Sequence, residues 1–253
     1  MSPFTSAPAI EAFHLAFLEV LRHQLDPARY VLKGGANLRY FFDSDRYSED
    51  IDLDVFGVLG TTLEKNVDSV LSSRPLEATL RSTGLAVVTD EVSKPKQSDT
   101  TRRWKVPIRA EGRVQPIRTK IEFSNRNGEN RYELAAVPGR VVQPYGLRPP
   151  SVQHYLGQPA TEQKVRALAG RSETQARDVF DLDLLLRKTL LEPAAVEADV
   201  RKTAAERALE LPFQAFVDQV APFLDPEVAQ LYDRSSWEQM QLGVNEALLE
   251  EDK

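Results

Sequence analysis

Leu32-Lys33-Gly34-Gly35, followed by Ser48-Glu49-Asp50-Ile51-Asp52-Leu53-Asp54, is the part of the sequence that decides the fold. In the second stretch polar and aliphatic residues alternate, which is the period of a β-strand. The hydroxyl and the carboxylates therefore share one face, and the aliphatic residues face a core. Asp50 and Asp52 then have Cα atoms about 6.6 Å apart, which suits two acids that bind one or two divalent cations. A calcium-like structural site and an exposed acidic edge strand are the alternative interpretations.

The glycine pair predicts a tight turn between a short buried strand at residues 30–32 and a helix at residues 36–42. Glycines at such a turn let the backbone approach a phosphate, and the helix N-terminus offers free amide donors. Lys33 adds a positive charge before the turn, and Arg39 follows on the helix as a candidate contact for a triphosphate. The segment is neither a Walker A loop nor a Rossmann fingerprint. An ordinary two-glycine turn and a surface arginine are the alternatives.

The acidic strand suggests a particular chemistry. Paired carboxylates can hold two Mg²⁺ ions, which activate an attacking hydroxyl and stabilise a leaving pyrophosphate. Magnesium prefers a few carboxylates together with substrate phosphate oxygens. Glu122, on a later predicted strand, is a candidate third ligand, although a Lys-x-Glu pair such as Lys120 and Glu122 is more often a surface ion pair. Asp54 is expected at the rim of the site.

Length and composition set broad limits. The 253 residues suit one large domain or two modest ones. The chain has no cysteine, which excludes disulfides, thiolate metal sites and cysteine nucleophiles. No run of about 20 apolar residues and no signal-like N-terminus occurs, so we expect a cytoplasmic protein with no membrane partner.

Basic residues concentrate in one segment of an otherwise acidic chain. The net charge is −6, but residues 94–120 hold nine basic and two acidic residues. Residues 103–109 and 117–123 alternate basic and apolar side chains, which predicts two antiparallel strands with basic polar faces. This pattern is typical of one polyanion-binding face, and a solvated strand face without a partner is the alternative. The candidate RNA contacts are Arg102, Arg103, Lys105, Arg109, Arg118 and Lys120.

The chain changes character near its middle. Proline and glycine crowd into residues 137–151, which predicts a linker or crossover. Before it we predict an α/β domain at residues 1–145, with helices at 8–25 and 61–82. After it we predict a helical domain at residues 150–253, with helices at 160–170, 174–188, 192–210, 212–222 and 226–249.

A lysine and an aspartate in the helical part are candidates for a shared role. Lys164 and Asp178 would be about 21 Å apart on one continuous helix. Gly170 offers a helix stop, and residues 172–175 suggest a capping box that starts a second helix. A helical hairpin would bring Lys164 and Asp178 together. An amphipathic helix with exposed charges is the alternative.

Three motifs in order resemble the AbiEii-type nucleotidyltransferases, the toxin half of many bacterial toxin–antitoxin pairs, including the mycobacterial Men toxins. They are residues 32–39, residues 46–52, and Lys164 with the run at 177–182, Arg-Asp-Val-Phe-Asp-Leu. The resemblance implies an α+β fold: a DNA polymerase β-like N-terminal domain with a mixed sheet, and a helical domain that contributes to the active-site cleft. It also implies transfer of a nucleotide from an NTP with Mg²⁺ or Mn²⁺, an RNA acceptor such as the tRNA 3′ end, and a cognate antitoxin.

The resemblance also implies residue roles. It makes Asp50 and Asp52 the metal ligands and assigns catalytic roles to Lys164 and Asp178. It assigns nucleotide contacts to Lys33, Gly34, Gly35 and Ser48. Ala36-Asn37 stands where the family more often has Thr-Ala, which leaves the choice of nucleotide open. No third acid is as firm as in classical polymerases, which leaves the number of metal ions open.

Two rival functions follow from the same residues. One is a small-molecule nucleotidyltransferase of the antibiotic-modifying kind, which needs an acidic acceptor pocket. The other is a catalytically inactive nucleotide-binding module. The basic segment argues against the first rival, and the retention of both strand acids argues against the second.

Overall fold

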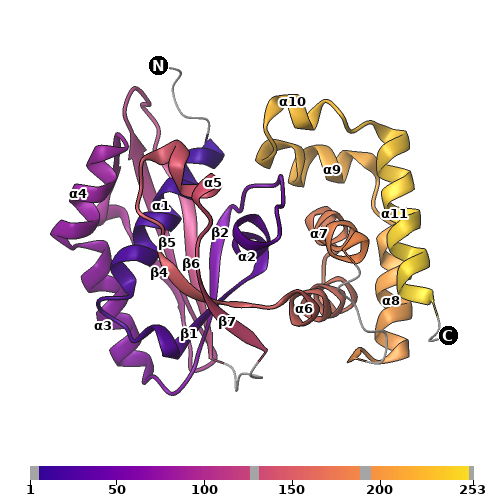
Figure 1. The fold of residues 1–253 in the computed structure, drawn as a ribbon, viewed down its shortest axis with the longest axis horizontal. Helices are drawn as coiled ribbons and strands as arrows, with labels where there is room; N and C mark the ends of the chain where they lie inside the picture. Colours follow the sequence, from indigo (N-terminus) through magenta and orange to yellow (C-terminus); the bar gives the residue numbers. More distant parts are fainter. Residues whose placement is uncertain (1–5, 126–130, 189–194, 251–253) are drawn as a thin grey trace. The chain divides into compact units, whose positions relative to one another are not determined.

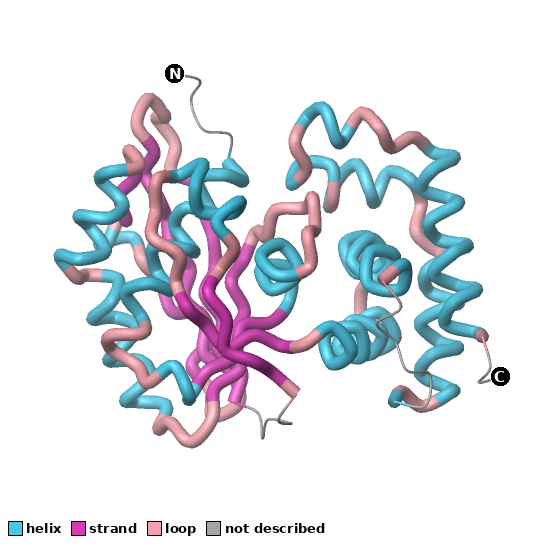
Figure 2. The backbone as a smooth tube through the Cα atoms, viewed as in Figure 1, coloured by secondary structure: helices cyan, strands magenta, loops and turns pink. Residues whose placement is uncertain are grey.

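The computed structural model describes residues 6–125, 131–188 and 195–250. The described chain forms two compact units (Figures 1 and 2). The first contains residues up to Phe41 together with Tyr47–Tyr155, and the second contains Phe42–Arg46 together with the chain from Leu156 onward. The second unit therefore includes a short loop that lies three residues before the acidic strand in sequence.

One mixed sheet organises the first unit. Its order is β3-β5-β6-β2-β1-β8-β7, and β4 pairs with β5 beside β3. The pairs β1–β8 and β2–β6 are parallel, and the other pairs are antiparallel. This mixed sheet, followed by helices, confirms the predicted α+β class. The strands are β1 (Tyr30–Lys33), β2 (Asp50–Val55), β3 (Leu85–Val87), β4 (Ser93–Gln97), β5 (Thr101–Ala110), β6 (Ile117–Asn125), β7 (Tyr132–Ala136) and β8 (Ser151–Tyr155).

Helices cover one face of this sheet. α1 (Ser6–Leu21) packs against both α3 (Gly60–Leu71) and α4 (Arg74–Ser82), and it contacts β5, β6 and β8 (Figure 1). The predicted helix at 61–82 is divided in two because Ser73 caps α4 by accepting a hydrogen bond from the Leu76 amide, with proline in the first turn. The alternate residues Trp104, Val106 and Ile108 of β5 enter the core beneath these helices.

The proline-rich segment lies against the sheet. It contains α5 (Gly139–Val142) and the 3₁₀ turn η3 (Gln143–Tyr145), and Val141 and Val142 are buried in the sheet core. β8 follows it and pairs with β1 through Leu32 and His154. The remaining 3₁₀ turns of this unit are η1 (Pro27–Arg29) and η2 (Thr89–Glu91). The segment is thus a crossover that leads into another strand of the same sheet.

The second unit is helical and has its own core. α8 packs against both α6 and α11 (Figure 1). Trp237 and Phe216 are buried at its centre, and the Trp237 indole donates to the Leu211 carbonyl at 3.1 Å. None of the described helices is long and apolar enough to cross a membrane. The helices are α6 (Gly157–Gly170), α7 (Ala176–Arg187), α8 (Ala198–Leu209), α9 (Phe213–Gln219), α10 (Pro226–Ala229) and α11 (Arg234–Leu249), with the 3₁₀ turn η5 (Ala221–Phe223).

Two predicted helices in this unit differ from the structure. The helix expected at 226–249 is interrupted, because Asp233 and Ser236 form a capping box that starts α11. The helix expected at 192–210 begins partly outside the described residues, and the described α8 starts at Ala198. In both cases helical periodicity predicted that a helix is present, but it did not predict the residues at which the helix begins and ends.

A buried histidine makes the sheet unit sensitive to acid. His14 on α1 is fully buried, and burial lowers its pKa to about 3. Below pH 6.5 the unfolded chain binds a proton that the folded chain excludes, so the free energy of unfolding falls by about 1.4 kcal/mol per pH unit down to pH 3. Urea unfolding at pH 7, 5.5 and 4 should therefore show a smaller acid-dependent loss in His14→Gln than in the wild type. Equal losses would contradict this account.

Candidate active site

The glycine turn lies directly against the acidic strand. β1 and β2 are antiparallel neighbours, with Lys33 opposite Asp52. α2 (Gly34–Phe41) starts at Gly34, two residues earlier than predicted. Gly34 has φ +67°, and a Cβ atom on it would lie 3.0 Å from the Asp52 Oδ2 atom. Only glycine satisfies both the backbone conformation and this close approach, so the start of α2 is held beside the Asp52 carboxylate.

A third carboxylate occupies the neighbouring strand. β6 runs parallel to β2, with Glu122 opposite Asp52 and Lys120 opposite Asp50. Directly paired residues present their side chains on the same face, so these three acids occupy adjacent positions there. Glu122, which the sequence left open as a ligand, is therefore placed where a third ligand would be needed. This row of the sheet continues on β5, where Arg103 is opposite Glu122.

Cations accompany the acids. Lys120 Nζ is 2.6 Å from Asp50 Oδ2, and Arg103 Nε donates to Glu122 Oε2 at 2.6 Å. Ser48 donates from its hydroxyl to the Asp50 backbone carbonyl at 2.7 Å, which holds the start of β2. With the side chains arranged in this way, the described residues contain no cluster of three or more acids or histidines that could hold a metal ion.

The donor set nevertheless suits magnesium. Asp50, Asp52 and Glu122 are hard oxygen donors on adjacent strand positions, and the glycine turn lies directly beside Asp52. A cation placed among them takes over the charge compensation that Lys120 and Arg103 provide. The residues therefore fit a divalent ion once these two side chains turn away.

Asp54 has a different position from the one expected. It is fully buried rather than at the rim, and its carboxylate accepts from Lys33 Nζ at 2.5 Å and from the Tyr155 hydroxyl at 2.8 Å. Lys33, the lysine before the glycine turn, is therefore held by the third acid of its neighbouring strand. Sequence alternation identified the shared face of the acids but gave no sign of this lysine partner.

Arg39 is engaged within the sheet unit. Its Nε donates to Glu11 Oε1 at 2.8 Å, and its guanidinium lies 4.0 Å above the centre of the Tyr47 ring. The side chain is largely buried, so it is not the surface arginine that the sequence offered as an alternative. Its contacts hold the residue that precedes Ser48.

The helical unit contains a buried ion cluster. α6 ends at Gly170 as predicted, and the hairpin of α6 and α7 brings Lys164 Nζ to 3.0 Å from Asp178 Oδ1. Burial on its own lowers the pKa of Lys164, but Asp181 and Asp178 raise it overall, so the lysine is charged. The predicted capping box at 172–175 is wrong: the Ala176 amide donates to Gln219 instead, at 2.8 Å.

Two members of this cluster had no role assigned from the sequence. Arg46 donates two hydrogen bonds to Asp181, at 3.1 and 2.9 Å, and Lys164 Nζ is 2.7 Å from the same carboxylate. Burial raises the pKa of Asp181, but Arg46 and Lys164 lower it overall, so this carboxyl stays ionised. The spacing of Asp178 and Asp181 on one helix face was a usable signal. Nothing local in the sequence pointed to Arg46.

The basic residues of the two central strands divide between the two faces of the sheet. Lys105 is opposite Lys120, and Arg118 is opposite Pro107, so one basic surface adjoins the acids. Arg102 is on the other face, where its guanidinium is 3.2 Å from Glu64 of α3. The basic surface on the face of the acids consists of Arg103, Lys105, Arg109, Arg118 and Lys120.

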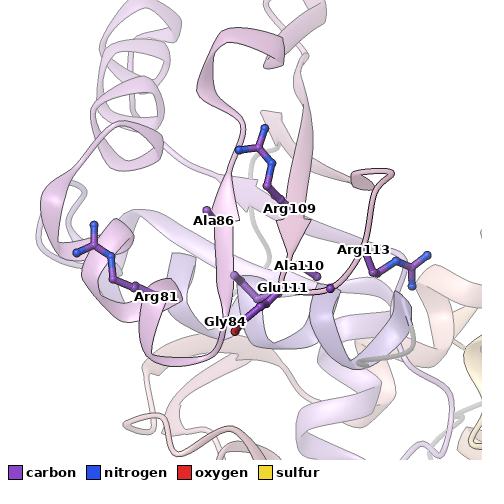
Figure 3. Close-up of a pocket in the computed structure, with 9 residues that line it drawn as sticks. Arg81, Gly84, Ala86, Arg109, Ala110, Glu111 and Arg113 are labelled. Carbon is purple, nitrogen blue, oxygen red and sulfur yellow. The ribbon is translucent and has the colours of Figure 1, made fainter. Parts of the chain in front are cut away.

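A shallow groove of about 340 Å³ lies at the β3–β5 edge of the sheet. Arg81, Arg109 and Arg113 line it, and in Figure 3 their guanidinium groups point in different directions. Glu111 lies between them, near Gly84. The groove therefore does not focus its positive charge on one anion, and it is separated from β2 by β5 and β6.

A family model matches this chain from residue 16 to residue 251, and its description is "Nucleotidyl transferase AbiEii toxin, Type IV TA system". The chain belongs to the AbiEii nucleotidyltransferase toxin family. This confirms the family and the class of enzyme that the three sequence motifs suggested. A search of curated proteins found no match.

Solved structures support the fold of this AbiEii protein. JHP933 from Helicobacter pylori has a TM-score of 0.59 and 19% identity, covering 95% of this chain and 91% of its own. A second H. pylori protein, described as a candidate nucleotidyltransferase, has a TM-score of 0.61 and 19% identity, covering 95% of this chain and 94% of its own. At this level of identity the likeness shows the fold.

The buried pair beneath the glycine turn should dominate local stability. Asp54→Ala leaves Lys33 without its acid partner, and we expect the free energy of unfolding in urea to fall by about 3 kcal/mol. Glu77→Ala breaks an exposed ion pair with Arg81 and serves as the control, with a change below about 0.5 kcal/mol. Similar small losses in both variants would show that Asp54 does not hold Lys33.

Proposed function

We propose that this AbiEii enzyme transfers a nucleotide from an NTP to the end of an RNA, with the tRNA 3′ end as the preferred acceptor, and so blocks translation. The observation that carries the proposal is the approach of Gly34 to Asp52, with Asp50 and Glu122 on adjacent positions of the same face. A phosphate-binding turn and a set of metal ligands are thereby adjacent.

Different residues of the sheet unit are proposed to bind the metal ion and the phosphates. Asp50, Asp52 and Glu122 would hold Mg²⁺ or Mn²⁺, which activates the attacking hydroxyl and neutralises the leaving pyrophosphate. The amides of Gly34 and Gly35 and the hydroxyl of Ser48 are the proposed phosphate contacts. Such chemistry consists mostly of positioning and charge stabilisation.

Two lysines are proposed to offset the triphosphate charge. Lys33 adjoins the glycine turn and is held by Asp54. Lys164 of the helical unit is assigned by its family motif, and Asp178 and Asp181 hold it in its charged form. In both cases a buried carboxylate contacts the ammonium group and limits its motion.

The basic surface supports RNA as the acceptor. Lys105, Arg109 and Arg118 are exposed on the face that carries the acids, as a phosphodiester backbone requires. A small-molecule acceptor of the antibiotic type would favour an acidic pocket, which this face does not resemble. The toxin family also supports a cognate antitoxin as a partner.

The central test is transfer of label to RNA. Total tRNA is incubated with the protein, Mg²⁺ and each α-labelled NTP in turn, and label is followed on the RNA. We expect label with at least one NTP and a loss of at least 100-fold in Asp50→Asn, because one metal ligand is removed. Absence of label with every NTP would exclude a tRNA acceptor, and full activity of Asp50→Asn would exclude the catalytic assignment.

The two faces of the sheet allow a matched test of RNA binding. In the double variant Lys105→Gln with Arg118→Gln we expect a KM for tRNA raised about tenfold at 0.15 M salt, and a shallower salt dependence, because phosphate contacts are lost. Arg102→Gln, which removes a positive charge from the opposite face, is the control and should leave the KM for tRNA unchanged. An equal rise in the KM for tRNA in both variants would mean that positive charge on either face of the sheet contributes to RNA binding, which would contradict the proposed binding surface.

A further inference from the structure

Two polar residues of the mostly apolar helix α1 are buried. Glu11 and His14 are 3% and 0% exposed, among alanine, leucine and phenylalanine neighbours. They are three residues apart, so they lie on the same side of the helix. Burying polar groups is costly unless they form hydrogen bonds, so their partners are informative.

His14 reaches the backbone in front of Asp50 through one hydroxyl. Its Nε2 atom is 2.8 Å from Thr119 Oγ1, and that hydroxyl donates to the Glu49 carbonyl at 2.7 Å. A hydroxyl has one proton to donate, so Thr119 must accept from His14, which carries its proton on Nε2. His14 Nδ1 has no partner in the described part of the chain. The histidine therefore acts as a neutral donor with a single polar contact.

Glu11 reaches the residue in front of Ser48. Its carboxylate accepts from Arg39 Nε at 2.8 Å and from the Tyr145 hydroxyl at 3.1 Å. Arg39 in turn lies over the Tyr47 ring, which is itself buried. One side chain of α1 thus acts on residue 47 and the other on residue 49.

We propose that Glu11 and His14 are positioning residues for nucleotide transfer, which act on the two residues that flank Ser48. Glu11 acts through Arg39 on the Tyr47 ring, and His14 acts through Thr119 on the Glu49 carbonyl. They set the orientation of the Ser48 hydroxyl and of the Asp50 carboxylate. Arg39, a candidate nucleotide contact in the sequence, becomes part of this support. The inference rests on the proposed function, because it concerns the rate of that reaction.

A matched pair of threonine variants tests the inference. Thr119→Val removes the hydroxyl that joins His14 to Glu49. Thr83→Val removes a buried hydroxyl that donates to the Leu80 carbonyl at 2.8 Å, away from β2. We expect Thr119→Val to lower kcat about tenfold with the KM for NTP changed less than about twofold, since small misplacements of reacting groups are costly. Thr83→Val should keep its kcat.

Substitutions of His14 test how far the hydrogen-bond donor must extend from the backbone. A glutamine amide can take the place of the imidazole Nε2 donor, whereas an asparagine amide reaches only to the place of Nδ1. His14→Gln should keep kcat within about threefold, and His14→Asn should lose as much as Thr119→Val. The double variant His14→Asn with Thr119→Val should lose no more than either single variant, because one interaction is removed twice.

The outcomes separate this inference from the proposed function. If the wild type labels no acceptor with any NTP, the proposed function fails and the inference fails with it. If the wild type is active and Thr119→Val matches Thr83→Val in kcat, or His14→Gln and His14→Asn have the same kcat, only the inference is overturned. Thermal unfolding of each variant shows whether a loss of kcat follows a loss of stability.

Discussion

The constraint on which the site depends is the accumulation of carboxylates on one face of two adjacent strands. Asp50, Asp52 and Asp54 share a face of β2, and Glu122 is opposite Asp52 on β6. Like charges at such separations repel each other. The strands can therefore pair only if positively charged side chains lie next to the carboxylates. Lys120, Arg103 and Lys33 supply it, each against one acid. Each of these lysines and arginines comes from a strand adjacent to its acid.

These pairs differ in what they permit. Asp54 is fully buried, so its lysine is a permanent partner whose loss leaves an uncompensated charge. The cations of Asp50 and Glu122 are about one-third exposed, and exposed pairs contribute little net stability. A divalent ion bound as proposed would therefore replace these two cations more readily than it would replace Lys33 at Asp54.

Alternation and spacing in the sequence predicted much of this arrangement. The acidic strand, the strand and helix on either side of the glycine pair, and the antiparallel pairing of the two basic strands are all as predicted. A period of two residues fixes which side chains of a strand share a face. The same alternation places the successive residues Arg102 and Arg103 on opposite faces of the sheet, although both were grouped as RNA contacts on the basis of the sequence. The hairpin of α6 and α7 followed from Gly170, a local stop signal. Its cap did not, because Gln219, from a distant helix, supplies the partner.

Contacts between distant residues lay beyond the sequence. Helical periodicity predicted the helix that contains α1 but assigned no position or role to Glu11 and His14. Both are buried, because Arg39 and Thr119 provide partners that only the folded sheet assembles. Arg46 meets Asp181 across 135 residues of sequence, and no local pattern predicts that meeting. The burial of polar residues therefore cannot be predicted from sequence periodicity, since it depends on hydrogen-bonding partners from distant parts of the chain.

The two lysines proposed for the triphosphate share a physical logic. A lysine that is buried alone loses its proton, and one that is fully solvated moves freely. Lys33 and Lys164 are mostly buried and each has an aspartate that is completely buried. The carboxylate fixes the position of the ammonium group, but it also offsets the charge that a phosphate would meet. At Lys164 a second cation, Arg46, shares Asp181 and restores part of the positive potential. At Lys33 the Tyr155 hydroxyl shares Asp54 and draws its charge away from the lysine. In both places a second partner of the aspartate, Arg46 or Tyr155, weakens the neutralisation of the lysine, so that part of its positive charge can act on a phosphate.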